Sequence, residues 1–185
     1  LLEGENPQAS LTRAPMKLND FDFSLPEHLI AQHPAPERDR SRMMVIRRAT
    51  GEREHRRFRD LPDILGPEHF LVLNNTKVIP ARVRACRPGK REEIEILLLK
   101  EIRPGEWLAL ARPGRKAPPG QILTIGGRTA RVLKAQESGG RILRFDTDAD
   151  LIPFLEKEGE PPIPPYIRRA PGQDLSEDRV RYQTV

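Results

Sequence analysis

The segment from Arg38 to Arg42 reads Arg-Asp-Arg-Ser-Arg and groups side chains that could do chemistry. Three guanidinium groups around one carboxylate and one hydroxyl (Ser41) suit RNA phosphates, with Asp39 holding an arginine fork in place. Asp39 is also our candidate general base, a role that requires water to be removed from around its carboxylate. The alternative is a solvated loop whose surface ion pairs each contribute little to stability.

A second polar cluster, Asn74-Asn75-Thr76, directly follows the apolar run Leu71 to Leu73, which we interpret as a strand buried on both faces. Asn and Thr side chains bond nearby backbone groups and commonly end a strand in a turn. With Lys77 and Arg82 close by, the cluster suits a polyhydroxyl or phosphate ligand. A purely structural turn explains the same pattern, so both interpretations stay open.

Arginine also recurs from Arg53 to Arg59. Strand alternation predicts Arg53, His55 and Arg57 on one face and Arg56 with Phe58 on the other. Such a basic face could follow an RNA backbone electrostatically, and an imidazole such as His55 can exchange protons near neutral pH. An ordinary exposed strand is the alternative, because acidic residues interrupt the basic run.

Two further segments near the end of the chain carry aromatic and cationic groups. The stiff run Pro162 to Arg169 could hold Tyr166 against a base or an adenine ring, or it could be a rigid strap with Tyr166 packed inside. In the last block, Arg181, Tyr182 and Gln183 offer donors and acceptors for ribose hydroxyls or a base edge. Helical spacing also predicts an Asp178–Arg181 pair.

Elements that would position these groups follow from capping and turn signals. We predict a short helix from Ser24 to about Gln32, a hairpin of residues 43–48 and 54–58, and a helical turn over residues 61–65. From about Lys77 to Phe145, repeated Gly-containing turns separate about six strands, which predicts a small antiparallel barrel with Trp107 in its core. A helix then runs from an Asp150 cap through Glu158, with Gly159 as its C′ residue.

Composition limits the class of protein. A formal charge of +5 and a pI near 9.7 favour polyanionic partners. The single Cys86 excludes an internal disulfide and a cysteine-based zinc site, and the four His are scattered. No apolar run reaches the roughly 20 residues that span a bilayer. We expect a cytoplasmic protein without a metal, and we interpret residues 1–15 as a disordered leader.

Four blocks together resemble the S-adenosylmethionine:tRNA ribosyltransferase-isomerase family of queuosine biosynthesis. They are DFDFSLPEHLIAQHP with ERDRSRMMV at residues 20–45, LVLNNTKVIPAR at 71–82, GEPPIPPYIRR at 159–169 and DRVRYQTV at 178–185. The resemblance implies an α/β domain interrupted by an inserted antiparallel β-barrel. We place the first part of the α/β domain at 16–76, the barrel at 77–147 and the return to the α/β domain at 148–185. The family's chain normally continues beyond this last block, so this chain alone is expected to lack the second half and part of the active site.

The resemblance also implies an activity. Such an enzyme moves the ribosyl moiety of S-adenosylmethionine, a co-substrate and not a true cofactor, to 7-aminomethyl-7-deazaguanine at the tRNA wobble position. It forms epoxyqueuosine and releases adenine and methionine. We expect the tRNA anticodon stem-loop as partner, no membrane contact and a monomer. An RNA-binding barrel without catalysis and a protein-interaction barrel are the alternatives. Asp39 is the expected catalytic residue, and the expected substrate-binding residues are Arg38, Ser41, Arg42, Asn74, Asn75, Thr76, Arg82, Tyr166, Arg181, Tyr182 and Gln183.

Overall fold

The computed structural model describes residues 16–170 and 172–184, and the chain divides into two compact units between Ala31 and Gln32. In the first unit, the described residues form two 3-10 helices, η1 (Leu18–Phe21) and η2 (Glu27–Leu29). The helix predicted as far as Gln32 is therefore wrong beyond Leu29. Pro26 and Pro34 enclose too few residues to offset the unfavourable nucleation of an α-helix. The predicted leader lies outside the described residues.

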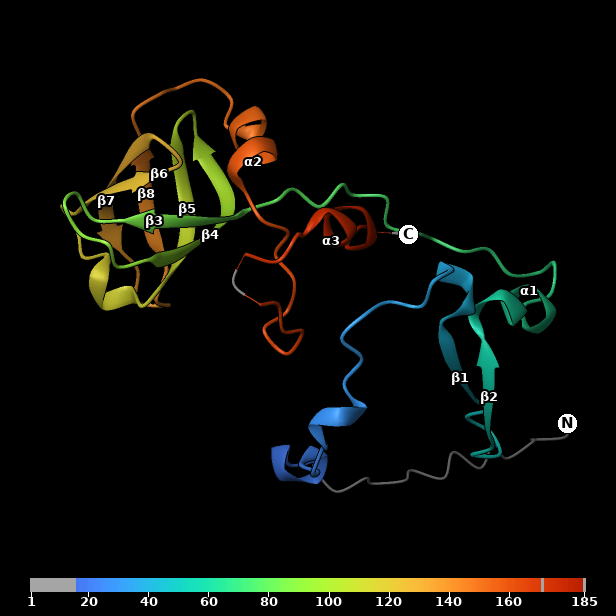
Figure 1. The fold of residues 1–185 in the computed structure, drawn as a ribbon. Helices are drawn as coiled ribbons and strands as arrows, with labels where there is room; N and C mark the ends of the chain where they lie inside the picture. The colour runs from blue at the N-terminus through green and yellow to red at the C-terminus, as the bar shows by residue number, and fades with distance from the viewer. Residues whose placement is uncertain (1–15, 171, 185) are drawn as a thin grey trace, which may run out of the picture. The chain divides into compact units, whose positions relative to one another are not determined.

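The second unit begins with a hairpin, as the sequence predicts. The 3-10 helix η3 (Arg38–Arg40) leads into β1 (Arg42–Ile46), which pairs antiparallel with β2 (Arg53–Arg57) (Figure 1). The 3-10 helix η4 (Phe58–Asp60) and the single helical turn α1 (Leu61–Ile64) follow. The predicted helical turn is thus confirmed.

The strand predicted at Leu71–Leu73 is wrong for this structure. These residues belong to neither a helix nor a strand, and they are 58%, 87% and 68% exposed. An apolar run becomes a buried strand only where neighbouring strands pair with it and cover both of its faces. Within the described part of the chain, no strand pairs with this segment.

A six-stranded antiparallel barrel forms where the sequence predicts one (Figure 1). The order is β3-β4-β5-β8-β7-β6, and pairing of β6 with β3 closes the barrel and removes exposed edges. The two-residue turn Gly126-Gly127 joins Ile125 to its partner Arg128, and both glycines have positive φ, as a tight hairpin turn requires. The strands are β3 (Arg82–Cys86), β4 (Ile94–Arg103), β5 (Glu106–Arg112), β6 (Ile122–Ile125), β7 (Arg128–Ala135) and β8 (Arg141–Phe145).

The hydrophobic core lies inside this barrel and beneath the helix α2 (Ile152–Glu158). Alternating strand residues such as Ile94 and Ile96 point inward, and Leu151 and Leu155 of the helical segment join the same cluster. Trp107 is buried, which confirms the predicted core position. Full burial of each such side chain contributes about 1.5–3 kcal/mol, so the barrel with α2 holds most of the stability.

The two ends of α2 differ in how well the sequence predicts them. The Asp150 carboxylate accepts a hydrogen bond from Ile152 N at 2.9 Å, near the predicted cap. Gly159 has φ −83°, so the left-handed C′ conformation predicted for it is wrong. Glycine is needed here for another reason: a Cβ atom would lie 1.9 Å from the carbonyl oxygen of Pro80. The bare backbone lets Glu160 form a β-bridge with Arg82.

The described residues outside the barrel form only the hairpin and short helices, the last of which is α3 (Ser176–Arg181). Side chains from residue 16 to residue 79 are all at least partly exposed. The α/β domain on either side of the barrel therefore stays a prediction. In the part of the chain that the structure describes, no helix is long and apolar enough to cross a membrane.

Candidate functional site

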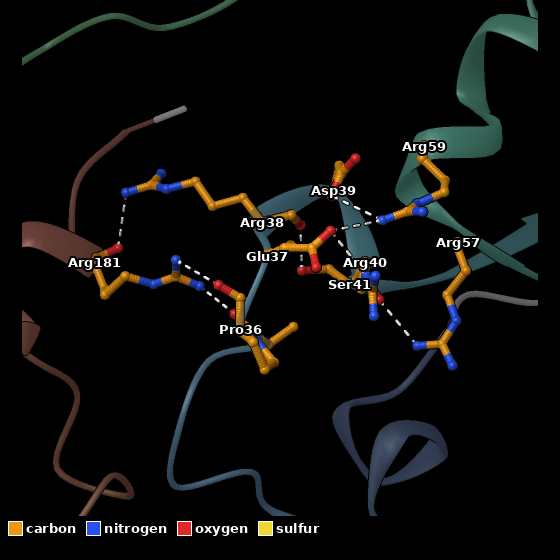
Figure 2. A network of polar contacts seen from close by, with 10 residues as sticks. Pro36, Glu37, Arg38, Asp39, Arg40, Ser41, Arg57, Arg59 and Arg181 are labelled. Carbon is orange, nitrogen blue, oxygen red and sulfur yellow. Dashed lines mark hydrogen bonds and ion pairs between the residues drawn. The ribbon is translucent and has the colours of Figure 1, made fainter.

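Arg38 links the polar turn of η3 to the end of helix α3. Its guanidinium donates to the carbonyl oxygens of Val180 and Gln183, each at 3.2 Å. It also donates to the carbonyl oxygen of Arg181 at 3.1 Å, the bond drawn in Figure 2. The last carbonyls of a helix have no partner within the helix and carry partial negative charge. The Arg38 side chain therefore acts as a cap for α3, delivered from a segment about 140 residues away.

Arg181 completes the link in the opposite direction. Its guanidinium donates to the carbonyl oxygen of Pro36 at 3.0 Å and to that of Ala35, both just before η3 (Figure 2). The predicted Asp178–Arg181 pair is wrong, because the helix directs Arg181 toward that loop. We call the reciprocal contacts of Arg38 and Arg181 the arginine clasp.

Asp178 instead forms a bidentate ion pair with Arg169. The two hydrogen bonds measure 2.7 and 2.8 Å, and each side chain is only 11% exposed. The hydrogen bonds and positive charge of Arg169 hold the pKa of the Asp178 carboxyl group below its ordinary value of 3.8, against the opposing effect of burial. This pair ties the proline-rich segment to α3.

Gln183 joins the end of the chain to the segment that enters the barrel. Its side-chain amide accepts from Val78 N at 2.9 Å and donates to Val78 O at 3.0 Å, as a neighbouring strand would. The Thr184 hydroxyl donates to the carbonyl oxygen of Thr76. The predicted block at residues 178–184 is therefore hydrogen-bonded to both the 35–42 and the 74–78 blocks.

Gln32, which sequence reasoning did not single out, connects the proline-rich segment to the first block. Its side-chain amide donates to Tyr166 O at 3.1 Å and accepts from Arg168 N at 2.7 Å. Arg169 in turn donates to Gln32 O at 3.0 Å. No sequence signal identified Gln32, because both partners are backbone groups 134 and 136 residues distant. Direct contacts thus join the four sequence blocks.

The candidate base Asp39 lies at the surface of this assembly. Its side chain is 55% exposed and accepts a hydrogen bond from Arg59 at 3.2 Å (Figure 2). A general base needs water to be excluded from its carboxylate, and in this chain the Asp39 carboxylate is open to solvent. Neighbouring Ser41 donates its hydroxyl to Arg38 O at 2.8 Å, which is a local turn bond.

The remaining predicted contacts are dispersed. Asn74 accepts from Thr76 N at 2.9 Å, an Asx turn of the kind that the structural alternative predicts. Tyr166 is 57% exposed, so the alternative in which its ring packs inside the strap is wrong. Among the predicted site residues, four have side chains with no hydrogen bond or ion pair to another described residue: Arg42, Asn75, Tyr166 and Tyr182.

Arg82 lines a groove of about 950 Å³, which has the size of a small-molecule pocket. The outer face of β3, β4 and β5 forms one wall, and residues from 160–170 and 172–175 form the other. Arg82 donates to Ile163 O at 2.7 Å, and Arg84 pairs with Glu160 at 3.0 Å. Apolar residues such as Leu97 and Leu110 lie between charged ones. The groove therefore combines an apolar lining with guanidinium and carboxylate groups.

Comparison with known proteins places this geometry in context. The chain matches the family described as "Queuosine biosynthesis protein" over residues 18–185. Two similar curated relatives are both named S-adenosylmethionine:tRNA ribosyltransferase-isomerase. The protein from Pelotomaculum thermopropionicum is 45% identical over 172 residues, which are 92% of this chain and 49% of the relative. The protein from Halothermothrix orenii is 46% identical with the same coverage.

Among solved structures, the chain is similar to an S-adenosylmethionine tRNA ribosyltransferase from Thermotoga maritima. The identity is 44%, the alignment covers 76% of this chain and 48% of that one, and the TM-score is 0.39. The chain spans about half the length of the curated relatives that it matches.

Proposed function

Because this chain belongs to the queuosine biosynthesis protein family, we propose that it takes part in the ribosyl transfer for which its relatives are named. S-adenosylmethionine is the co-substrate, and 7-aminomethyl-7-deazaguanine at the wobble position of tRNA is the acceptor. The products are epoxyqueuosine in the tRNA, free adenine and free methionine. The family match over residues 18–185 is the observation that carries this proposal.

The reaction sets three chemical requirements. A base removes a proton from the carbon beside the sulfonium, whose positive charge makes that carbon acidic. Polar groups hold the ribose and stabilise the charge that develops as adenine leaves. The tRNA amine must lie beside the ribose, where proximity raises the rate of attack. None of these steps consumes an external reductant or oxidant.

We assign Asp39 as the base, a role in which the bound substrates must exclude water from its exposed carboxylate. Asn74, Asn75 and Thr76 are assigned as contacts to the ribose or methionine. Tyr166 and Tyr182 remain available as contacts to a base or adenine ring, because their side chains have no polar partner among the described residues. Arg42 and Arg82 are the proposed contacts to phosphate or carboxylate groups.

Arg38, Arg181 and Gln183 receive a different role from the one that the sequence suggests. Their side chains bond to main-chain groups of the other blocks, so we assign them to positioning. The clasp would hold the turn that carries Asp39 at a fixed place relative to Tyr182. Catalytic groups must be held close to their productive geometry, and hydrogen bonds from neighbouring side chains commonly hold them there.

The α/β domain interrupted by the barrel also belongs to this proposal. Residues 16–76 and 148–185 would contribute to it, and the contacts among the four blocks support the idea that they act as one body. A tRNA-modifying role would place the protein in the cytoplasm.

A chimera tests the proposal directly. Residues 16–185 would replace the matching half of the Pelotomaculum thermopropionicum relative, and the product would be incubated with S-adenosylmethionine labelled in the ribose and with tRNA carrying the amine. We expect label to enter the tRNA at the rate given by the unaltered relative, within about tenfold. A chimera that folds and binds tRNA but transfers no label, while the relative does, would overturn the proposal.

The second candidate function is RNA binding without catalysis. The basic hairpin and the net charge of +5 favour it for this chain in isolation. RNA binding by the chimera without ribosyl transfer would select this alternative.

A further inference from the structure

The hairpin β1–β2 has two faces that differ in how their charges are neutralised. Directly opposed residues of an antiparallel pair project to the same face. The register opposes Arg42 to Arg57, Met44 to His55 and Ile46 to Arg53. We call the surface formed by these six residues the basic hairpin face.

The second face of the hairpin carries its own counter-charge. There Met43 is opposed to Arg56 and Val45 to Glu54. The Glu54 carboxylate binds Arg56 at 2.7 Å and Arg47 at 3.1 Å. These arginines hold the pKa of Glu54 below its ordinary value, so the carboxylate stays charged near neutral pH. The second face is therefore internally paired.

The basic hairpin face has no such compensation. Among the described residues, no acidic side chain forms an ion pair with Arg42, Arg53 or Arg57. Arg57 donates to the carbonyl oxygen of Arg40 at 2.9 Å, an acceptor that carries no formal negative charge. All six residues of the face are exposed.

Exposed arginines that lack carboxylate partners on one face of a two-stranded ribbon are complementary to a polyanion. We propose that the basic hairpin face is a docking surface for an RNA strand, with the opposed pair Arg42 and Arg57 at one end and Arg53 at the other end contacting backbone phosphates. Planar guanidinium groups bind phosphate oxygens in a bidentate manner. Met44 and Ile46 offer apolar contact between the cationic ends. The choice of RNA as the polyanion rests on the proposed function.

A matched pair of double variants separates this surface from the overall charge. R42Q/R53Q removes two charges from the basic hairpin face, and R47Q/R56Q removes two from the same hairpin elsewhere. Both lower the formal charge of the chain from +5 to +3. Binding of a fluorescent anticodon stem-loop would be measured for the 185-residue chain at several salt concentrations, without S-adenosylmethionine. Far-ultraviolet circular dichroism and Trp107 emission would check that each variant folds.

We expect R42Q/R53Q to weaken binding about tenfold in 0.1 M salt, because two phosphate contacts are lost. The plot of log K against log salt concentration should also become less steep, by about 0.7–0.9 for each lost contact. R47Q/R56Q should stay within about twofold of the wild type. Equal loss in both variants would show that only net charge matters and would overturn the inference. So would binding of polyglutamate as tight as that of RNA, because the surface would then fit an acidic protein.

The binding experiment and the chimera experiment can fail independently of each other. Ribosyl transfer by the chimera together with unchanged binding by R42Q/R53Q would overturn the docking surface alone. Selective loss of binding in R42Q/R53Q would support the docking surface even if no transfer were observed.

Discussion

Arg38 and Arg181 each bind main-chain carbonyls of the segment that carries the other. Arg38 donates to the carbonyl oxygen of Arg181 itself at 3.1 Å, and Arg181 donates to Pro36 O at 3.0 Å, two residues before Arg38. Main-chain segments at residues 32–38, 76–78, 166–169 and 178–184 are joined by this clasp and its neighbours Gln183 and Arg169. We predict that loss of these contacts loosens the candidate site locally, whereas the global stability of the chain depends on the barrel.

Arg38→Met should loosen α3 without unfolding the barrel. The change removes three charge-assisted hydrogen bonds from the end of the helix, so the local opening free energy should fall by about 2 kcal/mol. Native-state hydrogen exchange of the Arg179 and Tyr182 amides measures this opening, since both amides close turns of α3. Barrel amides should keep their protection. Arg115→Met, at an exposed position on the barrel, is the control and should change neither group.

The Arg169–Asp178 pair should make the same region sensitive to acid. The pKa of Asp178 lies below 3.8 in the folded state. Its stabilising contribution is therefore complete above the ordinary value and is lost as the pH falls through the lowered one. Asp178→Asn should cost about 3 kcal/mol of local stability at pH 7, because it leaves a largely buried guanidinium without its counter-charge.

Hydrogen-exchange rates of the α3 amides, corrected for intrinsic rates, would give the local opening free energy of the wild type and of Asp178→Asn at pH 7 and pH 3. The difference in opening free energy between the two proteins should be smaller at pH 3 than at pH 7. A difference that is constant with pH would show that Asp178 does not titrate as the ion pair requires.

Gly159→Ala should destabilise the barrel through a backbone clash. The added Cβ would meet the Pro80 carbonyl oxygen at 1.9 Å. Because the next residue, Glu160, pairs with Arg82 at the start of β3, a shift of either backbone would disturb that pairing. We expect a loss of about 1–3 kcal/mol in urea unfolding followed by Trp107 fluorescence. Gly66→Ala is the control, because its Cβ would meet only the flexible end of Glu68. Equal stability of the two variants would refute the close-approach explanation.

The sequence was sufficient for the barrel and the hairpin because local signals agree there. Glycine turns and alternating apolar residues such as Ile94 and Ile96 mark strands that pair mostly with the next strand in the chain; the β5–β8 and β3–β6 pairs are the exceptions. The Leu71–Leu73 prediction failed for the opposite reason. Its apolar pattern indicates a buried strand, but burial depends on partners that no local pattern identifies.

In the candidate site, too, the sequence reveals the chemistry of a side chain but not its partner. Residue types predicted Arg38, Arg181 and Gln183 as substrate-binding groups, and that role stays a prediction; in the structure their side chains bond to main-chain groups of the same chain. Their partners are main-chain groups, such as Val78 N, that lie more than 100 residues away. Side-chain chemistry reveals what a group can bind but does not reveal which acceptor the fold brings to it. Gln32 went unnoticed because an isolated glutamine has no distinguishing pattern.

Asp39→Asn should separate chemistry from binding in the chimera. If Asp39 removes the proton, turnover should fall by about 100-fold or more, because positioned bases typically contribute that much. The Kd for tRNA should stay within about twofold. Asp63→Asn, which removes an exposed carboxylate from α1, is the matched control. Normal turnover by Asp39→Asn would exclude Asp39 as the base.

Release of adenine tests the central claim most directly, because few reactions of S-adenosylmethionine liberate it. The chimera would be incubated with S-adenosylmethionine, with and without tRNA that carries 7-aminomethyl-7-deazaguanine. The account predicts one adenine per modified tRNA and none without the tRNA. No adenine from a folded chimera that binds this tRNA, under conditions in which the unaltered relative releases it, would contradict the account.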